Sequence, residues 1–418
     1  MFFEKTSLAN GLEILSEFMP GVRSVTLGVW VRVGSRDELP SQSGLSHFME
    51  HMMFKGTPTR SALDISLAFD RMGAELNAFT AKEYTCYYAR FQDEHLETAV
   101  QVLADMLQNS EFADEAARTE REVVIEEIAR YEDEPSDHVG DIFTEAMYPT
   151  HQLGRPILGT RAIVTGFGQQ ECAAYLSQHY HAANTVVTAA GNIEHSKLVQ
   201  LVESCFSGMP AGSANSRGEV LEAERQLLAY EQKDTEQAHL IYGMPGIALG
   251  SEDRFAGSLL ETALGGPMSS RLFQSIREQR GLAYAVYAST QPFMHAAQFS
   301  IYVGTRPANL KEVIAILRSE LNQVVRAGLS AAELADMQEF LVGYLVLSEE
   351  STRSHMMRLG SNAVLDLEIL SLDENIERIR AVSLEDVQRV AQMVLTAEPT
   401  IAVISPLGKS ELQELLEG

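Results

Sequence analysis

The sequence predicts an α+β protein built from two similar α/β halves of about 200 residues each, a common domain size. Its 418 residues, 45% hydrophobic and 22% charged, exceed what one ordinary core holds. A stretch rich in Ser, Gly and Ala, residues 207–224, lies near the middle and is typical of a linker. Beyond it "FSIYVGTRPANLKEVIAILRSEL" repeats the strand–helix pattern of "YYARFQDEHLETAVQVLADML". We therefore expect domains at 1–210 and 227–418, joined by a linker at 211–226.

The elements of the first half follow from periodicity and from end signals. Strands are expected in "GLEILSEFMP" and in "SVTLGVWVRVGSRDE", where apolar residues alternate from Val25 to Val31. A helix carrying "GLSHFMEHMMFKGTP" follows, and then a second helix, "ALDISLAFDRMG", which Gly73 ends. "AELNAFTAKEYTCYYARFQ" returns to strand character. "DEHLETAVQVLADMLQNSEF" and "ADEAARTEREVVIEEIARYEDEP" are expected as two long helices, the second ending near Pro135.

Charge and cysteine usage narrow the class of protein. The net charge of −26 argues against nucleic acid as a partner, because the phosphate backbone would be repelled. It is compatible with basic peptides as substrates, and equally with an acidic protein kept soluble by its charge. The cysteines are few and far apart, which favours a reducing compartment: Cys86, Cys172 and Cys205. No signal or transit pattern opens the sequence and no apolar run is membrane-spanning, so we expect a cytoplasmic protein without membrane contact.

A cluster of ionisable residues, "HFMEH", places His47, Glu50 and His51 within five positions. On a helix the two histidines lie only about 40° apart, so both imidazoles can converge on one ion, usually zinc. Glu50 projects beside the same site, either as a ligand or as a base that takes a proton from metal-bound water. The order H-x-x-E-H is the inverted form of the H-E-x-x-H metalloprotease motif. A catalytic zinc site needs three protein ligands, so another one must lie elsewhere.

The best segment for that ligand is "TEREVVIEEI", which contains Glu120, Glu122, Glu126 and Glu127. Glu120 and Glu127 are two helical turns apart and share a face, while the other two glutamates form a pair that points elsewhere. From the residues alone, these acids are either ligands or a solvated helix surface, which is the usual fate of a charge run.

These patterns together resemble the insulinase/pitrilysin family of inverted-motif zinc peptidases, particularly its shorter two-domain members related to the mitochondrial processing peptidase. The resemblance covers most of the chain and is carried by "GLSHFMEHMMFKGT", "GAELNAFTAKEYTCYY", "EREVVIEEI", "GRPILGT" and "GGPMSSRLFQSIREQRGLAYAVYAS". It implies two homologous domains, each an antiparallel-rich sheet flanked by helices, the second lacking a zinc site. It also implies one zinc ion per chain held by His47, His51 and Glu127. Glu50 is then the general base, and Glu120 a supporting residue.

The resemblance assigns roles to residues that the pattern alone leaves as ordinary strand or surface positions. An exposed edge strand would take up the peptide substrate as an additional strand. The residues of that strand are Asn77, Ala78, Phe79 and Thr80. Arg277 and Tyr284 match the family's pair that contacts the substrate carbonyl, where their donors would stabilise developing charge. Arg280 is only four residues before the tyrosine and does not fit the family spacing.

The activity that the resemblance implies is a zinc metalloendopeptidase that cleaves short or unfolded peptides. Family members enclose their substrate in a chamber of four such domains, so a two-domain chain implies a homodimer with sites shared between chains. A non-catalytic scaffold is the competing class, and the intact set of ligands speaks against it. One subunit of an obligate hetero-oligomer is a further alternative, and the retained Arg277/Tyr284 pair speaks against that.

Overall fold

The computed structural model describes residues 2–218, 220 and 224–417, and they form two compact units whose segments alternate along the chain. Unit 1 is made of Met1–Ala129, Arg155–Gly218 and Leu347–Ser371. Unit 2 is made of Arg130–Gly154, Glu219–Val346 and Leu372–Gly418. Two segments therefore differ from the expected domains at 1–210 and 227–418. Residues 130–154, expected in the first domain, lie in unit 2, and residues 347–371, expected in the second, lie in unit 1.

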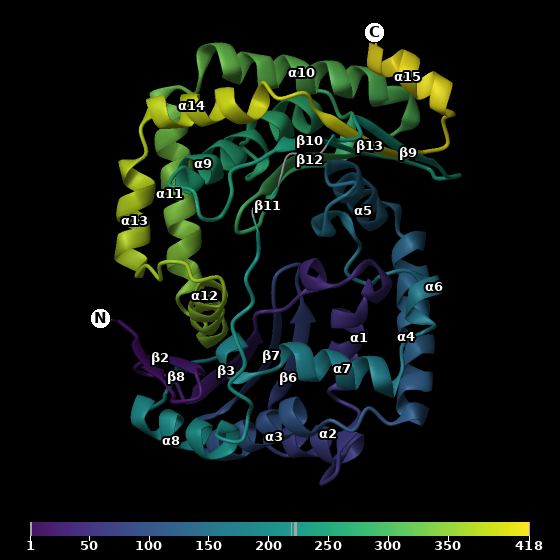
Figure 1. Cartoon of the computed structure of the whole chain (residues 1–418). Coiled ribbons are helices and arrows are strands. Elements are labelled where there is room, and N and C mark those ends of the chain that lie inside the picture. The colour runs from purple at the N-terminus through teal and green to yellow at the C-terminus, as the bar shows by residue number, and fades with distance from the viewer. Residues whose placement is uncertain (1, 219, 221–223, 418) are drawn as a thin grey trace. The chain divides into compact units, whose positions relative to one another are not determined.

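Unit 1 is centred on a mixed sheet whose strand order is β1-β2-β8-β3-β7-β6 (Figure 1). The strands are β1 (Glu4–Ser7), β2 (Glu13–Phe18), β3 (Ser24–Val31), β6 (Glu75–Thr80), β7 (Thr85–Gln92) and β8 (Thr185–Gly191). Neighbouring strands are antiparallel except β2 and β8, which run parallel. A separate small hairpin is formed by β4 (Gly56–Thr57) and β5 (Arg60–Ser61).

Helices cover both faces of this sheet. Those on one side include α3 (Leu96–Asn109), which contacts β3 and β7, and α8 (His195–Phe206), which contacts β2. The other face is covered by α12 (Thr352–Val364), which packs on β8, β3 and β2 (Figure 1). Gly360 permits this approach, because a Cβ there would overlap the buried indole ring of Trp30. The remaining helices that lie wholly or mainly in unit 1 are α1 (Leu45–Met52), α2 (Ala62–Asp70), α4 (Asp114–Asp133), α6 (Arg161–Val164) and α7 (Gln169–His179).

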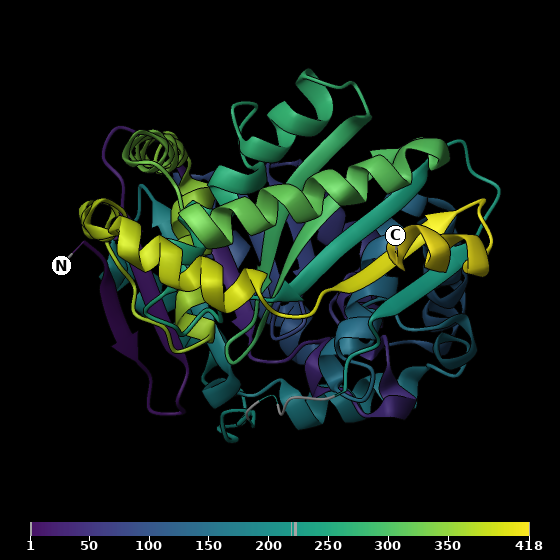
Figure 2. The same ribbon diagram turned by 90° about the horizontal axis from the view of Figure 1, so that it is seen from above.

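Unit 2 is centred on a second sheet, with strand order β11-β12-β10-β13-β9. Its strands are β9 (Leu228–Gln232), β10 (Ala238–Pro245), β11 (Ala283–Pro292), β12 (Ala297–Thr305) and β13 (Thr400–Ser405). The helices that lie wholly or mainly in unit 2 are α5 (Pro135–Met147), α9 (Arg254–Gly265), α10 (Leu310–Ala327), α11 (Ala331–Ser348), α13 (Leu372–Ala381), α14 (Leu384–Leu395) and α15 (Lys409–Glu417). Seen from above, α10 and α14 cross over the long strands (Figure 2), while α5 packs on β13, β10 and β9.

The two sheets repeat one topology. Read from its other edge, unit 2 has the order β9-β13-β10-β12-β11, which matches β2-β8-β3-β7-β6 of unit 1. The parallel pair also recurs, as β9 with β13 in place of β2 with β8. The predicted fold class is confirmed: two homologous domains, each with an antiparallel-rich sheet flanked by helices.

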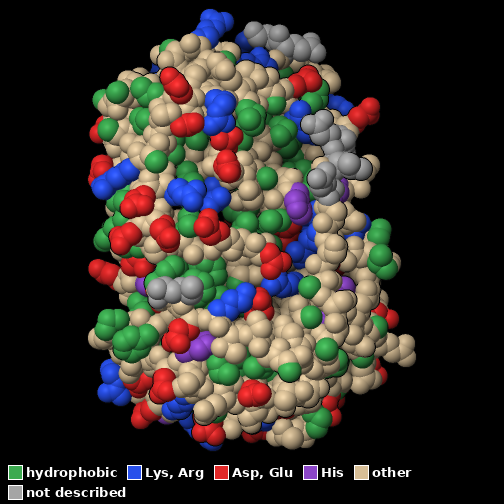
Figure 3. Space-filling view, turned by 60° about the vertical axis from the view of Figure 1, so that its left-hand side comes forward, with side chains coloured by type: hydrophobic (Ala, Val, Ile, Leu, Met, Phe, Trp, Pro, Cys, Tyr) green, Lys and Arg blue, Asp and Glu red, His purple; other side chains and the backbone are tan. Residues whose placement is uncertain are grey.

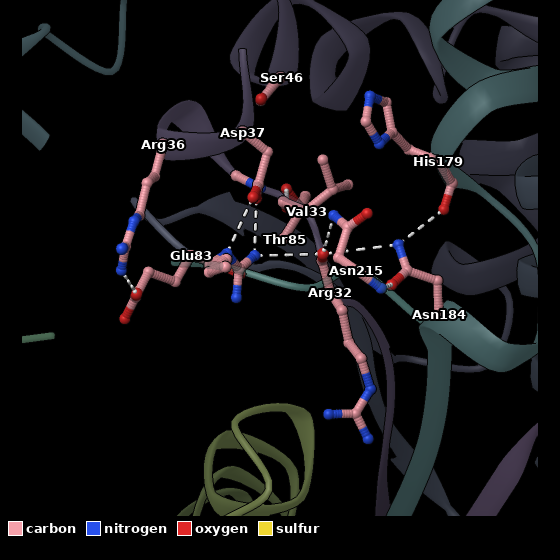
Figure 4. Close-up of polar contacts among 12 residues, drawn as sticks. Arg32, Val33, Arg36, Asp37, Ser46, Glu83, Thr85, His179, Asn184 and Asn215 are labelled. Carbon is pink, nitrogen blue, oxygen red and sulfur yellow. Dashed lines mark hydrogen bonds and ion pairs between the residues drawn. The ribbon is translucent and has the colours of Figure 1, made fainter. Parts of the chain in front are cut away.

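The first part of the segment expected as a linker, up to residue 218, is folded against unit 1. The guanidinium of Arg217 donates to both carboxylate oxygens of Asp37, at 2.6 and 2.8 Å. The side-chain amide of Asn215 donates to the carbonyl of Arg32 at 2.6 Å (Figure 4). These contacts order the chain up to residue 218; of the remaining expected linker, residues 219 and 221–223 lie outside the described residues.

On the face drawn in Figure 3, Asp and Glu side chains are interspersed with Lys and Arg rather than gathered in a single patch. Within the described part of the chain, none of the helices combines the length and the apolar character that a bilayer span requires.

Candidate metal centre

The start of α1 is fixed by groups that sequence patterns do not reveal. Gly44 precedes the helix with φ of +94°, and a Cβ there would lie 2.6 Å from the carbonyl oxygen of Leu158, so the position requires glycine. The buried carboxylate of Glu38 accepts the N–H groups of Gly44 at 2.9 Å and Ser46 at 2.7 Å. It thereby satisfies amides of the first turn. Burial raises the pKa of Glu38 to about 7, against the effect of these hydrogen bonds.

Three donor atoms converge at the side of this helix. His47 and His51 are one turn apart, with ring centroids 4.6 Å from each other. Their Nε2 atoms lie 3.8 and 3.6 Å from the same oxygen, Oε2 of Glu127 on α4. Zinc bound to nitrogen and oxygen at about 2.1 Å in a tetrahedron separates its ligand atoms by roughly 3.4 Å. The structure thus brings the three predicted ligands together at a spacing that fits zinc.

Glu120, one heptad before Glu127, orients one of the two imidazoles. Its Oε1 lies 2.8 Å from Nδ1 of His51, and its other oxygen forms an ion pair with the ammonium of Lys55. Burial opposes ionisation of Glu120, but the hydrogen bonds from His51 and Lys55 outweigh it and lower the pKa of this carboxyl. A carboxylate on Nδ1 fixes the ring and leaves Nε2 for the metal.

His47 is suited to donate as a neutral base. Burial, and then the proximity of His51, lower the pKa of His47 to about 3, so its imidazole is uncharged at neutral pH. Uncharged imidazole is the form that binds metal ions. Its Nδ1 is buried and has no hydrogen-bond partner among the described residues.

Glu50 stands beside the three-residue cluster, held by a strand. Its Oε2 accepts a hydrogen bond of 2.6 Å from the hydroxyl of Thr80, the last residue of β6. Burial raises the pKa of Glu50, while the bond from Thr80 acts in the opposite direction. The side chain is therefore restrained near the candidate ligands, where it can take up and release a proton.

The predicted substrate-binding strand, β6, lies at an edge of the unit 1 sheet. It pairs with β7 on one side, for example Asn77 with Tyr88 and Thr80 with Thr85. The N–H of Ala78 donates to the side-chain oxygen of Asn77 at 2.8 Å. Phe79 packs edge-on against Trp30, with centroids 5.9 Å apart.

Arg277 and Tyr284 lie in unit 2 and contact each other. The guanidinium of Arg277 donates to the carbonyl of Tyr284 at 2.8 Å and stacks 4.8 Å from its ring centroid. Tyr284 is 78% exposed. Arg280 instead donates to the carbonyl of Ser275, so it does not join the pair.

Sequence patterns missed three supporting residues. Lys55 lies beyond Met52, the last residue of α1, so no helical spacing predicts its ion pair with Glu120. Thr80 was predicted as a residue of the substrate-binding strand, but its bond to Glu50 was not predicted, because that bond depends on how β6 lies beside α1. No local pattern connects Glu38 with the helix that it caps.

Sequence similarity to known proteins extends over nearly the whole chain. Residues 13–161 match the family model described as insulinase (peptidase family M16), and residues 167–341 match the model described as peptidase M16 inactive domain. An uncharacterized zinc protease of Streptomyces coelicolor is 43% identical over 98% of this chain and 91% of its own length. An uncharacterized zinc protease of Bacillus subtilis is 42% identical over 96% of this chain and 97% of its own length.

Solved structures share the fold at low sequence identity. A protease from Helicobacter pylori superposes with a TM-score of 0.86 at 20% identity, covering 96% of this chain and 98% of that one. A peptidase M16 inactive domain from Pseudomonas fluorescens gives a TM-score of 0.91 at 19% identity, covering 98% of both chains. The two-unit architecture is therefore a recurrent one.

Proposed function

Because the chain belongs to the insulinase family (peptidase family M16), we propose that it is a zinc-dependent endopeptidase that cleaves short or unfolded peptides. The observation that carries the proposal is the convergence of His47, His51 and Glu127 with Glu50 restrained beside them. The names of the relatives, zinc proteases of Streptomyces coelicolor and Bacillus subtilis, support the choice of metal. We assign one zinc ion per chain.

The residues of the site divide the work of peptide hydrolysis. Zinc, when bound by the two imidazoles and the carboxylate of Glu127, supplies Lewis-acid polarisation and lowers the pKa of water. Glu50 accepts a proton from the attacking water and delivers it to the leaving amine, while Thr80 holds the carboxylate in position. Glu120 keeps His51 in the tautomer whose Nε2 lone pair is available.

Substrate binding is proposed to use main-chain contacts. A peptide that adds to the outer edge of β6 gains hydrogen bonds that do not depend on its side chains, from Asn77, Ala78, Phe79 and Thr80. Arg277 and Tyr284 supply donors for the charge that develops on the carbonyl oxygen. The net charge of −26 favours basic peptides, and the three free cysteines fit a cytoplasmic location.

The direct test measures metal content and cleavage together. The purified chain is expected to hold one zinc ion and to cleave a quenched peptide, and Glu50→Gln is expected to keep the zinc and lose cleavage by several orders of magnitude. Glu122→Gln, an exposed acid on α4, is the matched control and should cleave normally. A chain that holds zinc and cleaves nothing would instead be a non-catalytic scaffold.

A homodimer with shared sites is the assembly we propose, because the chain carries both the zinc motif and the Arg277/Tyr284 pair. Glu50→Gln and Arg277→Ala should each be inactive alone. Their mixture should regain part of the activity, since one of the two shared sites in a mixed dimer is intact. If mixed dimers form and no activity returns, the sites are not shared.

A further inference from the structure

In unit 2, α9 corresponds to α1, the helix with the candidate zinc ligands, and it carries a glutamate at the position of Glu50. α9 follows β10 as α1 follows β3, and those strands occupy the same place in the repeated order. At the spacing of His47, Glu50 and His51, α9 carries Ser258, Glu261 and Thr262. The carboxylate is therefore kept at this position, and both imidazoles are replaced by hydroxyl side chains.

The support of the carboxylate is also kept. Glu261 accepts hydrogen bonds from the hydroxyl and the backbone N–H of Thr290 on β11, the strand that corresponds to β6. In unit 1 the same relation joins Thr80 to Glu50. Because Ser258 and Thr262 replace the two imidazoles, the carboxylate of Glu261 does not stand beside a pair of histidine metal ligands as Glu50 does.

A cavity of about 200 Å³ opens beside Glu261 within unit 2. Its walls are mostly apolar and come from the segment after β10, from α9 and α14, and from the ends of β11 and β12. They include Ile247, Leu249, Phe255, Phe299, Val390 and Val394. Pockets that take drug-sized ligands measure roughly 300–1,000 Å³, so this cavity suits a smaller molecule.

Two opposite charges line this cavity, and neither has an ion-pair partner among the described residues. Burial raises the pKa of Glu261, against the effect of the bonds from Thr290. The guanidinium of Arg254 donates to the carbonyl of Ser251 at 3.3 Å and lies 4.7 Å from the ring centroid of Phe255. Arg254 and Glu261 are seven residues apart on α9 and therefore lie on one face. Their Cα atoms are separated by about 10.5 Å along the helix axis.

We propose that this cavity binds a dipeptide with apolar side chains, whose ammonium pairs with Glu261 and whose carboxylate pairs with Arg254. An extended dipeptide spans roughly 7 Å. With one charge-assisted hydrogen bond of about 2.8 Å at each end, the span grows to roughly 12–13 Å. The side chains of Arg254 and Glu261, whose backbone positions lie about 10.5 Å apart along the helix, are long enough to meet it. The apolar walls receive the side chains, and each ion pair offsets the cost of holding a charge in a partly apolar site. That such dipeptides are products of this chain rests on the proposed function; the binding site does not.

The experiment is calorimetric titration of the full chain carrying Glu50→Gln, which prevents hydrolysis, with Val-Leu, N-acetyl-Val-Leu and Val-Leu amide. Val-Leu is expected to bind at least about tenfold more tightly than either capped form, since each cap removes one ion pair. Glu261→Gln should abolish the preference over the acetylated form. Arg254→Met should abolish the preference over the amide, and melting curves would verify that both variants fold.

A variant that fills the cavity gives the second control. A Cβ on Gly257 would meet Ile247 at 3.4 Å, so Gly257→Ala is tolerated, whereas Gly257→Leu occupies the space and should remove binding. Equal binding of capped and free dipeptides, no heat at millimolar Val-Leu, or undiminished binding to folded Gly257→Leu would overturn the proposal. None of these outcomes depends on whether the unaltered chain cleaves peptides.

Discussion

Replacing Glu120 should weaken zinc binding in a graded way, because this residue acts on the metal through His51. Glu120 is 4% exposed, and its Oε1 lies 2.8 Å from Nδ1 of the imidazole. Loss of a carboxylate partner of a ligand histidine costs about 10–100-fold in metal affinity, or about 1.4–2.7 kcal/mol. In Glu120→Gln an amide oxygen still accepts the bond, so we expect about tenfold; Glu120→Ala removes the bond and should approach 100-fold.

The assay is competition for zinc against a chromophoric chelator at fixed pH, with melting curves recorded for each variant. Glu122→Gln on the same helix is exposed and serves as the control that loses the same charge without contacting His51. If folded Glu120→Ala binds zinc as tightly as the unaltered chain, Glu120 does not orient the histidine and the reasoning is wrong.

Three further predictions concern stability. Gly360→Ala should lower the free energy of unfolding by about 1–3 kcal/mol, measured in urea, because a Cβ there overlaps Trp30; an unchanged midpoint would contradict the packing of α12. Gly44→Ala should cost about 1–3 kcal/mol in the same measurement, because its φ is +94°; no loss would show that the start of α1 adjusts freely. Nδ1 of His355 lies 2.8 Å from Oε1 of Glu17. Burial lowers the pKa of His355, but the contact with Glu17 outweighs burial and the pKa is raised. A histidine whose pKa is raised on folding stabilises the folded state fully below its unfolded-state pKa of about 6.5. This stabilisation is lost as the pH rises through the higher folded-state pKa. The stability lost in His355→Gln should therefore be greater at pH 5.5 than at pH 9, and equal losses would refute the pairing.

The fold was largely predictable because its elements carry local signals. Alternation from Val25 to Val31 predicted β3, and the helix expected to end at Gly73 is α2, which ends three residues earlier, at Asp70. The exchange of residues 130–154 and 347–371 between units was not predicted. Which sheet a helix covers depends on packing between distant segments, such as Gly360 against Trp30, and short-range periodicity does not record it.

In the candidate site too, some residues were predictable from local spacing and others were not. Helical spacing alone brought His47, Glu50 and His51 together, since residues three and four apart share a face. Glu127 was one acid among four until the family resemblance selected it, and the structure then placed its Oε2 within 3.8 Å of both imidazoles. Thr80 was missed as the partner of Glu50 because a contact between a strand and a helix has no fixed spacing in the sequence.

The exchange of segments has a consequence for synthesis on the ribosome. The sheet of unit 1 is complete in sequence once Thr185–Gly191 has been made, yet α12, which covers one of its faces, begins roughly 160 residues later, at Thr352. At about 5–20 residues per second, synthesis of α12 therefore starts roughly 8–32 s after the sheet is complete in sequence. A nascent chain with an uncovered apolar sheet is a natural client for a chaperone. Truncation at the middle of the gene should consequently yield an aggregating fragment rather than an independent domain.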